Sequence, residues 1–412
     1  MAEKSRLSPR RFTFMQLMEL DACTRCGECI TWCPTYNEKT DLDAITPLQK
    51  IETTRRALDR HYSLLGKLFG RRTLTNESEQ EMLQVHSEGT YDCTLCGRCA
   101  VVCPVHIDTR ALWISMRETL VDQGIYPQAM DHMREMVTTH YNISGDANDD
   151  RLIWSQNLPE IPAGVGKKTK AEMVYFVGCV ASFYPQSYKI PQSMVTIMEQ
   201  ADLDYLTLGG EEWCCGFPLI IAGMEDEAVE IIRHNVEAVR KTEAKRLMTS
   251  CPSCYHVWKH EYPHIIGEPL GFEVLHSTEL LAEIIAAGKL AFRSLNETVT
   301  YHDPCDLGRT SGIYAAPRQV IQAIPGVNFV EMKDHHEYSL CCGGGGDVEM
   351  SDKELSAAVA KRRIQQAAET EAKYLVSACQ QCVRTLAGAA RREKIRIRTV
   401  DIVELVARTL AT

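Results

Sequence analysis

The eighteen cysteines of this chain fall into four groups whose spacing constrains the fold more than any other feature. Two groups share the pattern C-x2-C-x2-C-x3-C-P, and their cysteines are Cys23, Cys26, Cys29, Cys33 and Cys93, Cys96, Cys99, Cys103. The other ten form two sets of five, spaced C-x34-CC-x35-C-x2-C and C-x35-CC-x36-C-x2-C: Cys179, Cys214, Cys215, Cys251, Cys254 and Cys305, Cys341, Cys342, Cys379, Cys382. Corresponding members lie 126 to 128 residues apart, which indicates an internal duplication.

Each four-cysteine motif has the spacing of a [4Fe-4S] site of the ferredoxin type. In paired motifs of this kind, three thiolates of one motif bind one cluster, and the fourth, followed by proline, binds the other. We therefore assign to one cubane cluster Cys23, Cys26, Cys29 and Cys103, and to a second Cys93, Cys96, Cys99 and Cys33. The alternative is structural zinc, but zinc takes two separated pairs of ligands and not four cysteines within eleven residues.

Charge and hydropathy exclude several classes of function. The 412 residues carry a net charge of -10, which argues against binding to nucleic acid. No apolar run reaches the roughly 18 to 20 residues that cross a bilayer, so we expect no direct membrane span. We expect a cytoplasmic protein, which a partner could hold at the inner face of the membrane. A reducing compartment favours metal binding by the thiols over disulfides.

The segment between the two four-cysteine motifs predicts a helical ferredoxin domain. Thr46 and Pro47 are typical of a helix start, and the predicted helix runs from Pro47 to Phe69. Residues 124–170 include polar and Pro/Gly-rich stretches and are read as a linker. The predicted domains are an N-terminal tail (1–15), the two-cluster ferredoxin domain (16–123), the linker (124–170), and two repeats (171–290 and 291–412).

Each repeat reads as strands alternating with helices, which predicts two pseudo-symmetric α/β domains with parallel sheets. The cysteines that end apolar runs are Cys179, Cys251, Cys305 and Cys379. Because ligands gather at the carboxyl ends of parallel strands, each five-cysteine set is expected at one sheet edge. Five thiolates exceed the needs of one zinc ion, which favours a multi-iron cluster. Buried thiols or vicinal disulfides are the alternative, but they leave the paired CxxC motifs unexplained.

This arrangement resembles the D subunits of heterodisulfide reductases, in which duplicated cysteine-rich CCG domains follow a two-cluster ferredoxin domain. The resemblance covers roughly residues 16–412. It implies that each five-cysteine set binds a noncubane [4Fe-4S] cluster and that a disulfide is cleaved between the two clusters. The second vicinal cysteine pair is followed by glycines, since residues 341–346 read CCGGGG. The corresponding stretch at the first pair, residues 214–219, reads CCGFPL. Because glycine permits close backbone approach, the second loop is expected to pack nearer the cluster or the substrate.

Thiol products need protons, and the candidate donors beside the cysteines are His256 and His302; surface or satisfied histidines are the alternative. Arg309 could hold an anionic group of the substrate, with surface salt bridging as the alternative. Exchange between free dithiols is disfavoured because every cysteine is assigned as a ligand. The Gly run lacks a dinucleotide fingerprint, so we expect no flavin or NAD in this chain.

Two functions follow from these observations. The chain could pass electrons from the cubane clusters to noncubane clusters that reduce a disulfide, or oxidise thiols, with a sulfur-carrier protein as one form of substrate. Alternatively, it could relay electrons between a flavoprotein dehydrogenase, of the glycolate or lactate oxidase type, and a quinone-linked membrane cytochrome b. Both functions make the chain an iron-sulfur oxidoreductase subunit of a larger redox complex.

Overall fold

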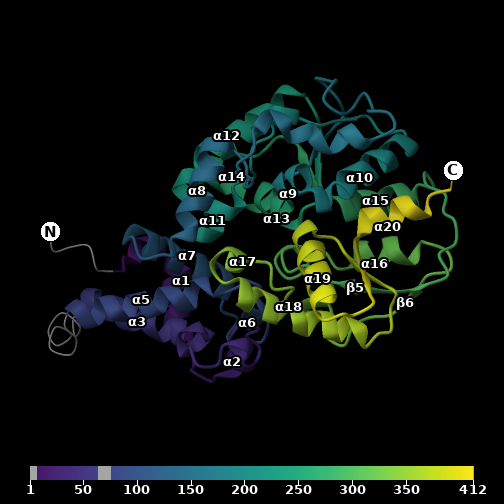
Figure 1. The fold of residues 1–412 in the computed structure, drawn as a ribbon. Coiled ribbons are helices and arrows are strands. Elements are labelled where there is room, and N and C mark those ends of the chain that lie inside the picture. The colour runs from purple at the N-terminus through teal and green to yellow at the C-terminus, as the bar shows by residue number, and fades with distance from the viewer. Residues whose placement is uncertain (1–6, 64–75, 412) are drawn as a thin grey trace. The chain divides into compact units, whose positions relative to one another are not determined.

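The computed structural model describes residues 7–63 and 76–411 of the chain (Figure 1). Its described residues form two compact units. Unit 1 takes the described residues within Met1–His132, Pro218–Glu225 and Gly343–Val359, and unit 2 takes those within Met133–Phe217, Asp226–Cys342 and Ala360–Thr412. Residues 1–6 of the predicted N-terminal tail and residues 64–69 of the predicted first helix lie outside the described residues.

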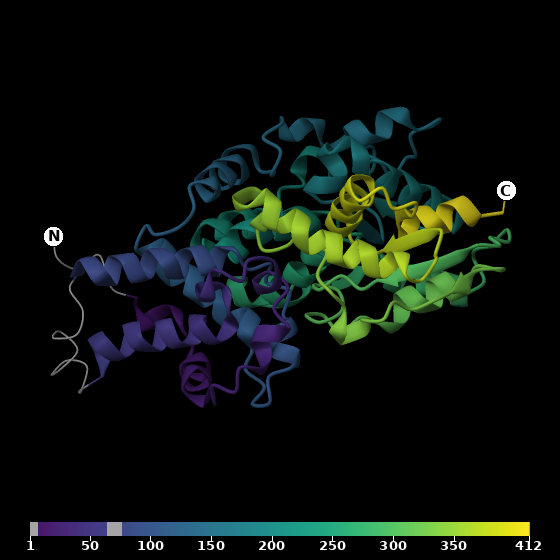
Figure 2. The ribbon, with the colours of Figure 1, turned by 60° about the horizontal axis from the view of Figure 1, so that its bottom comes forward.

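Unit 1 is helical, as the spacing between the first two cysteine motifs predicts. The Thr46 hydroxyl accepts a hydrogen bond from Gln49 N (3.1 Å) and caps α3 (Pro47–Tyr62), whose first residue is proline. Figure 2 shows α3 beside α5 (Asn76–Tyr91), against which it packs. Further elements are η1 (Pro9–Arg11), α1 (Phe14–Ala22), α2 (Glu28–Thr31), η2 (Tyr36–Glu38), η3 (Asp43–Ile45), α6 (Arg98–Val101) and α7 (Thr109–Asp122).

Two segments from the second half of the chain belong to unit 1, and each begins just after a vicinal cysteine pair. The first contains most of α11 (Phe217–Ala222), and Tyr91 Oη donates to the carbonyl of Ala222 at its end (2.9 Å). The second contains α17 (Val348–Ser351) and the start of α18 (Lys353–Ala368). The ferredoxin-type helices therefore pack with chain that the cysteine spacing alone assigns to the repeats.

Unit 2 contains two parallel four-stranded sheets, one in each repeat, and this confirms the predicted α/β class. Their strand orders are β2-β1-β3-β4 and β6-β5-β7-β8. The first sheet consists of β1 (Met173–Phe176), β2 (Tyr205–Leu206), β3 (Arg246–Thr249) and β4 (Glu273–His276). The second consists of β5 (Thr298–His302), β6 (Asn328–Phe329), β7 (Tyr374–Ser377) and β8 (Arg398–Asp401). The central pairs have matching registers, with Phe176 opposite Thr249 and His302 opposite Ser377.

The two repeats share one hydrophobic core in unit 2. Helix α10 (Lys189–Gln200) packs against α20 (Ile402–Thr409), and α15 (Ser277–Ala286) packs against α16 (Ala315–Gln322), as Figure 1 also shows. Buried residues such as Met194 and Val406 from these helices belong to one cluster.

The remaining elements are α8 (Ala129–His140), η5 (Asn148–Asn157), α9 (Cys179–Phe183), η6 (Pro185–Ser187), η7 (Gly209–Glu211), α12 (Glu225–Lys241), α13 (Pro252–His256), η8 (Val257–Glu261), α14 (Tyr262–Ile266), η9 (His336–Tyr338) and α19 (Gln380–Arg392).

Candidate iron-sulfur sites

The first cubane site lies between the loop that follows α1 and the start of α7. One cavity is lined by all four cysteines assigned to this cluster, Cys23, Cys26, Cys29 and Cys103. Gly27, in the left-handed region (φ 77°), turns the chain between the second and third of them. Burial, together with the neighbouring thiols, raises the pKa of the Cys29 thiol to about 12. The same cavity is also lined by Cys99, which is assigned to the second cluster, so these four ligand roles stay a prediction.

The second cubane site is more deeply enclosed. All four assigned cysteines are buried: Cys33, Cys93, Cys96 and Cys99. Burial raises the pKa of the Cys33 thiol, Lys50 lowers it, and the Cys93 thiol raises it. Burial raises the pKa of Cys99 to about 12, with contributions from Cys93, Cys96 and Cys33. Cys33 thus lies among the thiols of the other motif, as the exchange of fourth ligands requires, although the ligand roles stay a prediction.

Lys50 is a buried cation beside this second site. Its side chain is 1% exposed, and Nζ lies 5.3 Å from the ring centroid of Trp113. Among the described residues Nζ has no hydrogen-bond partner. Its charge acts on the Cys33 thiol. Sequence reasoning placed Lys50 on a helix but gave no signal of its burial, because helix positions rich in Lys and Arg are usually solvated.

The first five-cysteine set gathers at the carboxyl edge of the first sheet. Cys179 begins α9 just after β1, and Cys251 is the N-cap of α13 just after β3. Gly178 (φ 81°) separates strand from helix, and a Cβ there would lie 3.4 Å from Cys254 Sγ. Hydrogen bonds from the thiols of Cys214 and Cys254 lower the pKa of Cys215 to about 6. The vicinal pair and the CxxC pair are therefore in contact.

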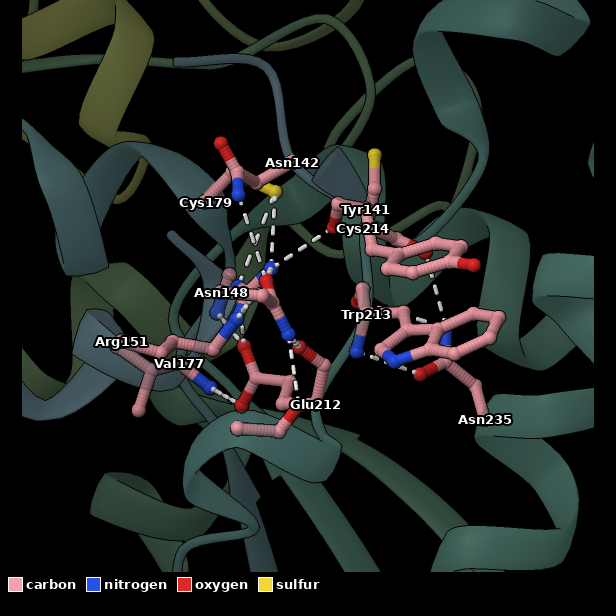
Figure 3. Close-up of polar contacts among 12 residues, drawn as sticks. Tyr141, Asn142, Asn148, Arg151, Val177, Cys179, Glu212, Trp213, Cys214 and Asn235 are labelled. Atoms are coloured by element: carbon pink, nitrogen blue, oxygen red, sulfur yellow. Dashed lines mark hydrogen bonds and ion pairs between the residues drawn. The ribbon is translucent and has the colours of Figure 1, made fainter. Parts of the chain in front are cut away.

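A buried ion pair supports the single cysteine of this set (Figure 3). Arg151 Nη1 and Nη2 lie 3.8 and 3.7 Å from Cys179 Sγ, and Nη1 lies 3.0 Å from Glu212 Oε1. The Glu212 carboxylate also accepts from the backbone N–H groups of Val177 (2.9 Å) and Gly178 (2.8 Å). Glu212 thereby fixes the turn before Cys179, while Arg151 presents a guanidinium to the thiol. Sequence reasoning missed both residues, and Arg151 lies within the predicted linker.

The second five-cysteine set gathers in the same way at the second sheet. Cys379 is the N-cap of α19, and its Sγ accepts from Cys382 N (3.3 Å). Hydrogen bonds with Cys342 and Cys379 raise the pKa of the Cys382 thiol well above its ordinary value. Burial also raises the pKa of the Cys305 thiol well above its ordinary value, and the Cys341 thiol raises it as well. The five thiols again converge from strand ends and the vicinal pair.

The three residues predicted to take part in the chemistry all lie in unit 2. His256 is 7% exposed, and its Nε2 lies 3.1 Å from Glu261 Oε1. His302 ends β5, where a ring nitrogen and the sulfurs of Cys342 and Cys382 lie within 4.8 Å of one another. Arg309 donates from Nη1 to two carbonyls of the loop before the second pair, Glu337 O (3.1 Å) and Ser339 O (2.8 Å).

The glycine run approaches the ferredoxin motif. A Cβ on Gly346 (φ 65°) would lie 2.3 Å from the carbonyl oxygen of Cys93, and one on Gly345 would lie 2.9 Å from that of Thr94. The close approach that glycine permits is therefore made to the backbone around the second cubane site. The expectation that the second loop packs nearer the cluster or the substrate stays a prediction.

Arg117 holds the glycine run against the loop at Cys93 within unit 1. Its guanidinium is buried on α7 and donates to four carbonyls, those of Thr90, Cys93, Ile221 and Gly346. The last two belong to the segments that follow the two vicinal cysteine pairs. One cation thus joins the Cys93 ligand loop to both segments.

The eighteen cysteines all lie within the described residues, and no disulfide joins any of them. They are gathered in four sets, mostly buried, with cations near several of them. Buried thiolates need such positive charge, and iron-sulfur clusters bind through thiolates. The donor sets therefore fit iron-sulfur clusters at all four places.

Comparisons with known proteins agree with this geometry. The 4Fe-4S dicluster domain family matches residues 19–107, and the cysteine-rich CCG domain family matches residues 173–259 and 299–387. The D subunit of the dihydromethanophenazine:CoB–CoM heterodisulfide reductase of Methanosarcina barkeri is 39% identical over 98% of this chain and 97% of its own length. The chain belongs to the family of heterodisulfide reductase D subunits.

Other members and relatives extend the comparison. The D subunit of the same reductase in Methanosarcina mazei is 38% identical over 100% of this chain and 99% of its own length. The EtfAB:quinone oxidoreductase of Syntrophomonas wolfei is 32% identical over 81% of this chain and 49% of its own length. As a member of the D-subunit family, the chain is an iron-sulfur oxidoreductase subunit with two [4Fe-4S] clusters in its dicluster domain. Within the described residues, no helix is both long and apolar enough to span a bilayer.

Proposed function

We propose that this chain accepts electrons at its two ferredoxin-type sites and uses them at its two CCG sites to reduce a disulfide to two thiols. The reaction takes up two electrons and two protons for each disulfide, and in reverse it oxidises two thiols. The observation that carries the proposal is the completeness of both five-cysteine sets, each gathered at the edge of its own parallel sheet. The two Methanosarcina relatives named as heterodisulfide reductase subunits support it.

The ten CCG cysteines would hold two noncubane [4Fe-4S] clusters, which supply one-electron transfer and iron that binds sulfur. The protein's part is to position and shield these sites. Eight of the ten cysteines are buried, and only Cys251 and Cys305 are partly exposed. These two occupy different positions in the repeats: Cys251 is a CxxC cysteine in the first, and Cys305 is the single cysteine in the second.

His256 is the residue best placed to deliver a proton near the first site. It follows Cys254 by two residues and is buried, while its partner Glu261 has a side chain that is 35% exposed. Ser311 Oγ lies 3.5 Å from the other ring nitrogen and donates to Asp306 O (2.6 Å). The pair His256–Glu261 thus connects a buried ring to a water-exposed carboxylate, which is the arrangement of a proton relay.

Arg309 is the candidate contact for an anionic group on the substrate. Its Nη1 holds the loop before Cys341, and its charge lowers the pKa of the Cys305 thiol. A guanidinium placed beside the partly exposed cysteine would attract a carboxylate or phosphate on an approaching disulfide. The proposed partners are a flavoprotein or a membrane cytochrome b and quinone module, which would hold the chain at the inner face of a membrane.

A second function is favoured by one relative. The similarity to the EtfAB:quinone oxidoreductase of Syntrophomonas wolfei supports a relay that passes electrons from a flavoprotein toward quinone without a small-molecule substrate. In that case the two CCG sites would serve as redox stations only.

A spectroscopic titration separates the two functions. The anaerobic, reduced protein is mixed with small disulfides and, after oxidation, with the corresponding thiols, while the electron paramagnetic resonance of the CCG sites is recorded. Disulfide reduction predicts that one compound changes that spectrum and that the same change is lost in Cys342→Ser. An unchanged spectrum with every compound, together with reoxidation by a quinone-linked partner, would establish the relay instead.

A further inference from the structure

The second CCG site contains a buried pair of residues that the first site lacks. His302 lies three residues before Cys305, and Arg363 on α18 lies sixteen before Cys379. The positions with the same spacing in the first repeat are Phe176 and Asn235. Both members of the pair thus differ together between two halves that otherwise match in strands and cysteines. The duplication supplies an internal comparison for what the pair adds.

Arg363 is held rigidly, and it fixes the hydrogen on His302. The guanidinium donates to Asp334 O (2.9 Å), to Ser339 Oγ (3.0 Å) and to the Gln366 side chain. Its Nε–H donates to Nδ1 of His302 (2.9 Å). Since arginine has no acceptor, Nδ1 of His302 must carry a lone pair at this contact. The hydrogen of the neutral ring therefore lies on Nε2.

The other ring nitrogen of His302, Nε2, is buried without a protein partner in the part of the chain that the structure describes. A ring nitrogen and the Sγ atoms of Cys342 and Cys382 lie within 4.8 Å of one another. A buried N–H without a protein acceptor, on a ring that lies this close to two thiols, needs an acceptor nearby. Sulfur is the acceptor that this site offers.

We propose that His302 is a fixed N–H donor to sulfur at the second CCG site, and neither an iron ligand nor the proton donor for the thiol product. An iron ligand would need a lone pair on Nε2, and a proton donor would need the doubly protonated ring. Arg363 opposes both forms because its Nε–H occupies Nδ1. The inference rests on the proposed cluster at this site but not on a disulfide as substrate.

The first repeat shows what the same framework does without the pair. Asn235 Nδ2 donates to the carbonyl of Cys214 (2.9 Å), and its Oδ1 accepts from Trp213 N (3.0 Å), so it anchors the vicinal cysteine loop as Arg363 anchors its own. Phe176 offers no polar hydrogen. The polar donor at that site is Arg151, from outside the repeat. The two sites therefore differ in whether a histidine ring lies beside the cysteines.

The experiment follows the reduction potential of the CCG sites by electron paramagnetic resonance in the anaerobic, cluster-loaded chain between pH 6 and 9. His302→Met removes the donor, and His302→Gln keeps an N–H near the position of Nε2. Phe176→Met is the matched control, because it makes the same replacement at the equivalent place in the first repeat. Hydrogen bonds to sulfur raise the potential of an iron-sulfur cluster.

In His302→Met, the potential of the second CCG site should be more negative than in the wild type, by the same amount at every pH. In His302→Gln it should keep the wild-type value. In Phe176→Met the potential of the second site should also be unchanged. An unchanged potential in His302→Met, or a difference that varies with pH, would overturn the inference. Double-resonance spectra of protein with 15N-labelled histidine supply a second test on the unmutated chain. They should show an exchangeable proton coupled to the second site, whereas a strongly coupled, iron-bound nitrogen would overturn the inference. The disulfide titration is a separate measurement, so the proposed function can fail while this inference stands.

Discussion

The buried pair Arg151–Glu212 gives the sharpest test of how the first CCG site is supported. Both side chains are 1% exposed, and Arg151 also donates to Asn148 Oδ1 (3.0 Å) and Tyr141 O (3.1 Å). Removing one partner of such a pair leaves an uncompensated buried charge and costs about 3–5 kcal/mol of unfolding free energy. For a unit of this size each 1 kcal/mol lowers Tm by about 2–4 °C, so Arg151→Met should lower Tm by about 6–20 °C.

A double-mutant cycle separates the pair from its other contacts. Glu212→Gln keeps an acceptor for the backbone N–H groups of Val177 and Gly178, and Arg151→Met/Glu212→Gln leaves no unpaired charge. The double variant should therefore lose less stability than the sum of the single variants, by about 2 kcal/mol. The assay is anaerobic calorimetry of the cluster-loaded chain.

The matched control is Arg134→Met. Arg134 pairs with Glu227 at 3.5 Å, and both side chains are more than a third exposed, so this pair should contribute less than about 1 kcal/mol. A loss of under about 2 °C in Arg151→Met, or strict additivity in the cycle, would refute the account of the buried pair.

Three further predictions concern unit 1. Cys33→Ser should remove the resonance of the enclosed second cubane and leave the resonance of the first cubane, at the cavity lined by Cys23, Cys26 and Cys29. Loss of the first cubane's resonance alone would contradict the exchange of fourth ligands. Gly346→Ala meets the Cys93 carbonyl and should lower Tm well beyond Gly312→Ala, which has a similar φ (74°) but no atom within 4 Å; equal losses would contradict the packing. Burial raises the pKa of Asp347 to about 7 from 3.8, so its stabilisation is complete below about pH 4 and is lost as pH rises through 7. Asp347→Asn, at a left-handed position that asparagine tolerates, should flatten the Tm profile between pH 4.5 and 8; an unchanged slope would contradict the raised pKa.

Much of the architecture could be predicted because cysteine spacing and hydrophobic alternation are local signals. The strands before Cys179, Cys251, Cys305 and Cys379 and the helix start at Thr46 are confirmed. The edge strands were not predicted. β2 and β6 are only two residues long, and β4 and β8 run directly into helices. None of these four strands therefore forms a separate segment with a recognisable hydrophobic period. The domain boundaries and ligand roles stay predictions.

The residues around the sites were harder to predict than the grouping of the cysteines. Arg151, Lys50 and Arg363 are charged residues in polar stretches, where the sequence favours a solvated position. Their burial depends on segments distant in the chain, as with Arg363 and His302, which are separated by 61 residues. His302 could be singled out by its distance from Cys305, but its tautomer follows only from the Arg363 contact.

Iron content combined with Mössbauer spectroscopy shows whether both five-cysteine sets hold clusters. The anaerobically purified chain should contain about 16 iron atoms, from two cubane and two noncubane four-iron clusters. Cys342→Ser and Cys215→Ser should each lose about four of them, with the loss confined to the noncubane signal. An iron content near 8 with only cubane signals would contradict the account.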